Sequence, residues 1–231
     1  MKEIFLEAEN LIYSCENFNL EVSFSCQKNT MTSIVGPSGS GKSTILKLIA
    51  GLEKPAQFTK IILDKLDITN EKPAKRGIGM VFQKANLFNH MHVDDNVAYG
   101  LRCKGMNKKE SRIMAAEFLK KFNLEGFEKR SPETLSGGEA QRVALARTLI
   151  TKPKLILFDE PFSALDAPLR KKLASEIKQL QKEFGFTGIM VTHDIAEAKS
   201  LSDRIILIKS GKITWEGSAE NFSEEMITSA L

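Results

Sequence analysis

Residues 34–44, with the sequence IVGPSGSGKST, decide the fold of this 231-residue chain. A short apolar strand, Thr32–Val35, is expected to run into this segment, and a helix from about Lys42 to Ala50 to follow it, capped by Gly51. The segment fulfils every fixed position of the pattern G-x-x-x-x-G-K-[ST]. Glycines let such a loop fold tightly, so that its N–H groups and the helix N-terminus face an anion. The stretch therefore predicts a site for the phosphates of a nucleotide.

Within this loop, Lys42 is expected to reach the β- and γ-phosphates, and the Ser43 hydroxyl to bind Mg²⁺. The expected nucleotide-binding residues of the loop are Gly36, Pro37, Ser38, Gly39, Ser40, Gly41, Lys42, Ser43 and Thr44.

A second chemical signal is the apolar run Leu155–Phe158, which ends in Asp159 and Glu160. The carboxyl ends of parallel strands are where α/β folds bind ligands. Asp159 is expected to face Mg²⁺, directly or through water, and Glu160 to polarise an attacking water as general base. Taken alone, two acids at a strand end are as typical of a solvated surface as of a functional site. The phosphate loop beside them favours the functional interpretation.

Apolar and polar residues alternate in ways that predict further strands and helices, and hence an α/β fold with a parallel sheet. In residues 92–151 the apolar residues have helical spacing, and this stretch is expected to form a mostly helical insert. In it Asn107 caps a helix with an apolar face of Ile113, Ala116, Phe118, Leu119 and Phe122. The expected strands are Lys2–Glu9, Asn19–Ser25, Lys60–Leu63, Ile78–Phe82, Ile189–Thr192, Arg204–Ile208 and Lys212–Trp215, with turns at residues 16–17 and 210–211. The expected helices are Val93–Lys104, Lys108–Phe122, Leu169–Phe184 and Ile195–Leu201.

Composition narrows the class of protein. The net charge of +4 is a small difference between 33 basic and 29 acidic residues, and the basic residues are spread widely, so no nucleic-acid partner is expected. Cys15, Cys26 and Cys103 fit no zinc site and are expected to be reduced, as in a cytosol. The sequence shows no signal-peptide core and no apolar run that could cross a bilayer, so a membrane partner would be another chain.

The most specific motif is LSGGEAQR, residues 135–142. Together with the motifs above it resembles the ATP-binding-cassette (ABC) ATPases, over about Leu6 to Gly217. Ser136, Gly137 and Gly138 would open a helix and present free N–H groups, a second anion site. One phosphate loop but two such helix starts suggests a head-to-tail dimer. The resemblance implies a homodimer in which the signature of one copy closes over the ATP of the other.

The resemblance implies roles for further residues. Gln83 would sense Mg²⁺ and the attacking water, and Asp166 lies in the loop that would cross the dimer interface. His193 would contact the γ-phosphate. Tyr13 stands where relatives place an aromatic ring against adenine, with Phe18 as the rival and a plain core tyrosine as the other alternative.

The whole chain, residues 1–231, is expected to be one ABC ATPase domain with a P-loop NTPase core and a parallel sheet. Residues 1–91 and 152–231 would form this core with an N-terminal antiparallel β-subdomain, and residues 92–151 the helical signature subdomain.

The segments FDEPFSALDAPLR (158–170) and PAKRGIGMVFQ (73–83) are similar to the importer type of this family. This resemblance implies an ATPase bound peripherally at the cytoplasmic side of the inner cell membrane. Its partners would be transmembrane permease subunits and, indirectly, a solute-binding protein. A thiamine-type cargo is the leading expectation, with iron and other small solutes open. The alternatives are an exporter ATPase and a non-transport ABC protein of DNA repair or translation. Phe88 and Met91 would line the permease groove or belong to the subdomain core.

Overall fold

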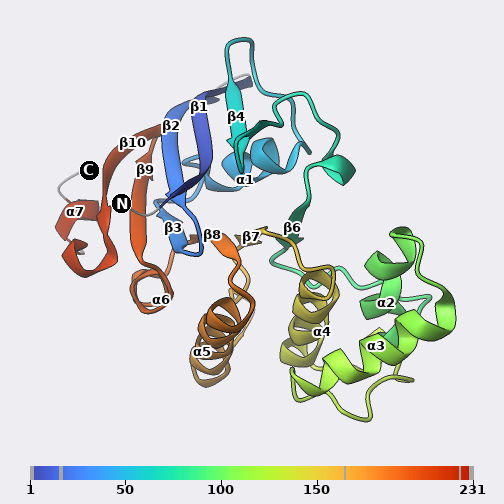
Figure 1. The fold of residues 1–231 in the computed structure, drawn as a ribbon. Helices are drawn as coiled ribbons and strands as arrows, with labels where there is room; N and C mark the ends of the chain where they lie inside the picture. The colour runs from blue at the N-terminus through green and yellow to red at the C-terminus, as the bar shows by residue number, and fades with distance from the viewer. Residues whose placement is uncertain (1–2, 16–17, 164, 224, 229–231) are drawn as a thin grey trace.

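The structure is a computed structural model that describes residues 3–15, 18–163, 165–223 and 225–228. Its strands form two sheets (Figure 1), one of four strands in the order β2-β1-β4-β5 and one of six in the order β10-β9-β3-β8-β7-β6. The strands are β1 (Ile4–Cys15), β2 (Phe18–Gln27), β3 (Met31–Val35), β4 (Lys60–Leu63), β5 (Leu66–Asp67), β6 (Ile78–Val81), β7 (Leu155–Asp159), β8 (Thr187–Thr192), β9 (Arg204–Lys209) and β10 (Lys212–Ser218). The α-helices are α1 (Lys42–Ala50), α2 (Val93–Cys103), α3 (Lys108–Lys120), α4 (Gly137–Leu149), α5 (Ala167–Phe184), α6 (Ile195–Leu201) and α7 (Glu225–Thr228).

The larger sheet confirms the predicted α/β core. Strands β9, β3, β8, β7 and β6 run parallel, and β10 adds to the edge through an antiparallel hairpin. That hairpin turns at Ser210 and Gly211, which both have positive φ, as expected for a two-residue hairpin loop. All residues of β3 and β8 are buried, the pattern of strands covered on both faces. Because β8 lies between β3 and β7, the carboxyl ends of the three strands meet at one edge of the sheet.

The smaller sheet is antiparallel and covers α1. Strand β1 pairs with both β2 and β4, and side chains such as Leu6, Leu20, Ile45 and Leu155 share one buried cluster. Helix α1 is thus held between this sheet and the parallel one. The turn predicted at residues 16–17 lies outside the described residues.

Helices α2, α3 and α4 lie together on one side of the molecule, away from β1 and β2 (Figure 1). Their shared core includes Val97, Leu119 and Leu145, and continues into the parallel sheet through Phe158. The predicted cap Asn107 is present, since its side chain accepts a hydrogen bond from the Glu110 N–H.

The predicted apolar face of α3 is wrong at one position. Ile113 is 57% exposed, whereas Ser111, Ala115 and Leu119 form the buried stripe of this helix. This stripe has the i, i+4 spacing of one helix face, and Ile113 is rotated away from it. Among the described residues, no helix is long and apolar enough to span a bilayer.

Candidate functional site

Two glycines of the loop between β3 and α1, Gly36 and Gly41, leave no room for a Cβ atom unless their neighbours move. A Cβ atom on Gly36 would lie 2.1 Å from the backbone oxygen of Ile208, in β9. One on Gly41 would lie 2.6 Å from the Phe18 ring, and Gly41 also has φ near 101°. The loop therefore packs directly on the neighbouring strand and on β2, which fixes its backbone at the end of β3.

Lys42 is the first residue of α1 and its side chain folds back into the loop. The Lys42 ammonium donates hydrogen bonds to the backbone oxygens of Gly36 and Pro37, at 2.9 and 2.8 Å. Burial lowers the pKa of this lysine, although Glu160 and Asp159 oppose the shift. A buried cation held by two neutral carbonyls, with two carboxylates near it, is in a position to gain from an anionic ligand.

Ser43 links the loop to the end of β7. Its hydroxyl donates to Asp159 Oδ1 at 2.7 Å. A hydroxyl and a carboxylate fit Mg²⁺, which is commonly held by one or two carboxylates together with substrate phosphates. Among the described residues, no group of three or more His, Cys, Asp or Glu could hold a metal ion.

Glu160 and His193 meet where β7 and β8 end. The two side chains approach to 3.2 Å between Glu160 Oε2 and His193 Nδ1. Glu160 has a positive φ of 45°, and its N–H donates to the backbone oxygen of Val191 at 3.0 Å. A residue in the left-handed region at the end of a strand turns the chain sharply, and here it directs the carboxyl group toward the histidine.

A cleft of about 500 Å³ opens on this loop. Both Tyr13 and Phe18 line it, so the structure leaves the choice between them open. Cys15, Lys47 and Glu53 also line the cleft, and sequence reasoning did not identify them. No motif marks these three, since they reach the cleft only through the packing of β1 and α1. The full lining is Tyr13, Cys15, Phe18, Ser38, Gly39, Gly41, Lys42, Ser43, Thr44, Lys47, Glu53 and Glu160.

The remaining candidate residues do not line this cleft. Gln83 is exposed two residues after β6, the strand that pairs with β7. Ser136, Gly137 and Asp166 are also exposed, and Gly138 is buried against Leu169. Asp166 is the N-cap of α5, where its carboxylate accepts from the Leu169 N–H at 2.9 Å.

The start of α4 differs from the expected row of free N–H groups. Ser136 and Glu139 form a capping box: the Ser136 hydroxyl accepts from the Glu139 N–H, and the Glu139 carboxylate accepts from the Ser136 N–H. Of the three residues expected to present free N–H groups, Ser136 therefore has its N–H bonded within the chain. The capping box explains the acid at 139, because a carboxylate at this position satisfies a donor that the helix cannot.

Comparison with known proteins identifies the family. The profile of the ABC transporter family matches residues 20–163. The chain is 45% identical over 206 residues to the Fe(3+) ions import ATP-binding protein FbpC of Escherichia coli K12, covering 89% of this chain and 58% of that protein. It is 44% identical over 230 residues to the spermidine/putrescine import ATP-binding protein PotA of Clostridium acetobutylicum, covering 97% of this chain and 64% of that one. The chain thus spans about three-fifths of the length of these relatives.

A solved structure agrees with the sequence comparisons. A post-hydrolysis dimer of the ATP-binding cassette MJ0796, bound to ADP and phosphate, superimposes with a TM-score of 0.81 at 35% identity, covering 94% of this chain and all of that one. The fold is that of an ABC cassette, with one antiparallel and one mainly parallel sheet. By sequence and by fold, this chain belongs to the ABC transporter family.

Proposed function

We propose that this chain is the ATP-binding and ATP-hydrolysing subunit of a membrane transporter that imports a small solute. The observation that carries the proposal is the cluster at one sheet edge, where Lys42 and Ser43 of the phosphate loop meet Asp159, Glu160 and the nearby His193. The names of the relatives, which are ATP-binding proteins of import systems, support the transport role.

The reaction is the hydrolysis of ATP to ADP and phosphate. Lys42 and the loop N–H groups hold the phosphates and stabilise the charge that develops on the transferred group. Glu160 orients the attacking water and accepts its proton, while His193 holds the γ-phosphate. Mg²⁺ held by Ser43, Asp159 and Gln83 would neutralise phosphate charge.

A second copy of the chain completes each site. Ser136, Gly137 and Asp166 are exposed, so they are accessible to the ATP of a partner. Gly138 lies beneath them and lets α4 approach Leu169, where a Cβ atom would clash at 2.5 Å. ATP would then favour the closed dimer by binding it more tightly than the open form, and hydrolysis would release it.

The membrane partner is a permease that docks on the helical segment, and the chain is bound peripherally at the cytoplasmic face of the inner membrane. Partly buried Phe88 and Met91 lie at the start of this segment, and the Phe88 ring is 4.8 Å from that of Tyr99, which is 40% exposed. A solute-binding protein would deliver the cargo. The relatives named above import Fe(3+) ions or spermidine and putrescine, so thiamine stays a prediction that they do not favour over these cargoes.

The test is affinity purification of the tagged chain from gently solubilised native membranes, followed by mass spectrometry and an ATPase assay. We expect a polytopic membrane protein in stoichiometric amount, and ATP hydrolysis that Lys42→Ala abolishes. The same purification with Lys42→Ala is the control, because this change leaves the surface of the helical segment intact. Ribosomal or DNA-repair proteins without a membrane chain would overturn the transport role and favour the non-transport alternative. An export substrate for the copurified permease would favour the exporter.

A further inference from the structure

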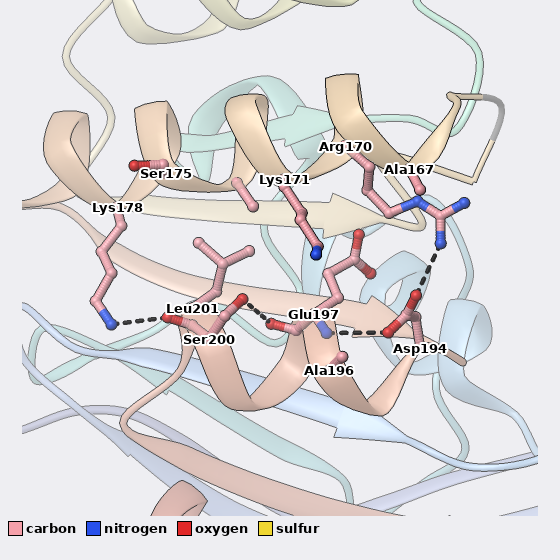
Figure 2. A pocket seen from close by; sticks show the side chains of 11 residues that line it. Ala167, Arg170, Lys171, Ser175, Lys178, Asp194, Ala196, Glu197, Ser200 and Leu201 are labelled. Carbon is pink, nitrogen blue, oxygen red and sulfur yellow. Dashed lines mark hydrogen bonds and ion pairs between the residues drawn. The ribbon is translucent and has the colours of Figure 1, made fainter.

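Arg170 contacts two loops that follow the strands of the site, the loop before α5 and the turn before α6. This residue lies in the first turns of α5, and Figure 2 shows its guanidinium reaching across to Asp194 at the start of α6. Arg170 Nη1 donates to Asp194 Oδ2 at 2.7 Å, and Nη2 donates to the backbone oxygen of Leu165 at 3.1 Å. One side chain thus holds both the loop before α5 and the turn before α6.

Asp194 is held by three hydrogen bonds, one of them from Arg170. Its other carboxylate oxygen accepts from the Glu197 N–H at 3.0 Å, and its own N–H donates to the Thr192 hydroxyl at 3.0 Å. The Glu197 hydrogen bond, followed by Arg170, lowers the pKa of Asp194, so the aspartate is charged at neutral pH. Since Asp194 directly follows His193, the position of the ion pair sets the position of the histidine backbone.

Arg170 lies near two acids of this pocket, and its hydrogen bond goes to Asp194. Glu197 also lines the pocket, but its carboxyl group hydrogen-bonds the Thr192 hydroxyl, and burial raises its pKa, which favours its neutral form. The side chains of Arg170 and Asp194 are each 29% exposed, so solvent screens this pair less than a pair at the open surface. Asp194 is therefore the partner that decides where the guanidinium lies.

The contacts close a ring that includes the site. Glu160 accepts through its backbone oxygen from the N–H and the hydroxyl of Ser163, at 3.3 and 3.1 Å. The chain then leads through Leu165 to Arg170, across to Asp194, and back through His193 to the Glu160 carboxyl group. A shift of Ser163 or Leu165 can therefore reach His193 by two routes, one through Glu160 and one through Arg170 and Asp194.

We propose that Arg170 is a positioning residue that moves Leu165 and Asp166, in the loop before α5, together with His193 as one unit. This inference rests on the proposed function, in which that loop faces a second copy and His193 faces the γ-phosphate. Docking of the partner on the loop then sets the distance between His193 and Glu160, so that hydrolysis follows closure of the dimer and nucleotide binding does not depend on the contact.

The experiment compares steady-state ATP hydrolysis and ATP affinity in Arg170→Ala, Asp194→Asn and the double variant. Asparagine at 194 keeps an oxygen that can cap α6 but loses the charge. The matched control is Lys178→Ala, because Lys178 also joins α5 to α6, by donating to the Ser200 backbone oxygen at 2.7 Å at the far end of the same pocket. Figure 2 shows the two contacts at opposite ends of the helix pair.

We expect Arg170→Ala to lower kcat by about 10-fold or more, since small misplacements of catalytic groups have effects of this size, with ATP affinity within about twofold. Lys178→Ala should keep kcat within about twofold. The double variant should be no slower than Arg170→Ala, because Arg170→Ala already breaks the ion pair that Asp194→Asn weakens, along with the contact to Leu165. An equal loss in Lys178→Ala, a loss of ATP affinity that accounts for the lower rate, or multiplied effects in the double variant would overturn the proposal.

Hydrogen–deuterium exchange on the same proteins tests the contacts of Arg170 with Leu165 and Asp194 independently of ATP hydrolysis. In Arg170→Ala we expect faster exchange at residues 163–166 and at the start of α6 together, and no such change in Lys178→Ala. Unchanged exchange in both segments would refute the joining role of Arg170. A wild-type chain that binds ATP but never hydrolyses it, even with its membrane partner, would instead refute the proposed function and leave the exchange result to decide the joining role.

Discussion

Substitution of Gly36 by alanine tests the geometry of the phosphate loop most directly. The new methyl carbon would lie 2.1 Å from the Ile208 backbone oxygen and 3.0 Å from the Ser40 hydroxyl oxygen. Since a close C···O contact is about 3.3 Å, the loop and the strand must separate by roughly 1.2 Å. Ile208 is paired with Ile213 of β10, and the neighbouring Leu207 is paired with Val35 of β3, so this strand has little freedom and the loop must move.

The expected cost follows from that movement. Overpacking of this kind destabilises a protein by about 1–3 kcal/mol, and a contact with fixed backbone belongs at the upper end. For a chain of this length each kcal/mol lowers Tm by about 2–4 °C, so Gly36→Ala should melt roughly 6–12 °C lower. A loop displaced by about 1 Å should also bind ATP roughly 10-fold more weakly, the equivalent of about 1.4 kcal/mol.

Gly188→Ala is the matched control. Its Cβ atom would also approach a neighbour to 2.1 Å, but that neighbour is the flexible side chain of Met31. Both residues lie at the opposite end of their strands from the phosphate loop. We therefore expect a smaller loss of about 1–2 kcal/mol and unchanged ATP affinity, measured by thermal melting and by titration with a fluorescent ATP analogue. If Gly36→Ala were no less stable than Gly188→Ala and bound ATP normally, the argument from close approach would be refuted.

Four further substitutions test the candidate site. Lys42→Ala should reduce hydrolysis by about 100-fold or more, because it removes the buried cation at the phosphates; near-normal turnover in a phosphate-release assay would contradict the assignment. Glu160→Gln should bind MgATP but not hydrolyse it, and so accumulate a dimer in light scattering, whereas a purely monomeric protein would argue against completion of the site by a second copy. Ser136→Ala should slow hydrolysis and leave ATP binding by the monomer intact; weaker monomer binding would make Ser136 a local structural residue. Tyr13→Ala should weaken ATP binding several-fold, since one stacking contact contributes about 1 kcal/mol, and an effect seen only in Phe18→Ala would assign the stacking to Phe18.

The sequence predicts the elements whose ends are set by local chemistry. The bounds of α1 and α6 agree residue for residue with the expected Lys42–Ala50 and Ile195–Leu201. Gly51, with φ near 77°, ends α1 in the left-handed conformation that favours glycine. The phosphate loop is equally local, because its pattern, its strand and its helix are contiguous in the chain.

Features that depend on packing could not be predicted in this way. Strand β1 is expected to end near Glu9 but continues to Cys15. Within it, Asn10 adopts a positive φ at a register shift in the pairing with β2. Such an irregularity interrupts the alternation on which a strand is recognised. Glu53 reaches the cleft only because α1 is packed beneath the antiparallel sheet, and no spacing in the sequence encodes that contact.

The capping residues of the chain suggest how the start of α4 can both cap its own helix and, in the proposed dimer, face the ATP of the partner. Asn107 and Asp166 cap their helices through hydrogen bonds of 2.9 Å, whereas the Ser136 hydroxyl is 3.3 Å from the Glu139 N–H that it caps. The Glu139 carboxylate holds the Ser136 N–H more closely, at 2.7 Å, and this backbone contact accounts most for the lowered pKa of Glu139. The start of α4 is therefore fixed chiefly by Glu139, and the Ser136 hydroxyl makes the longest capping hydrogen bond of the three. Turning that hydroxyl toward a phosphate would cost about 1 kcal/mol or less, which a charge-assisted hydrogen bond to the anion can offset.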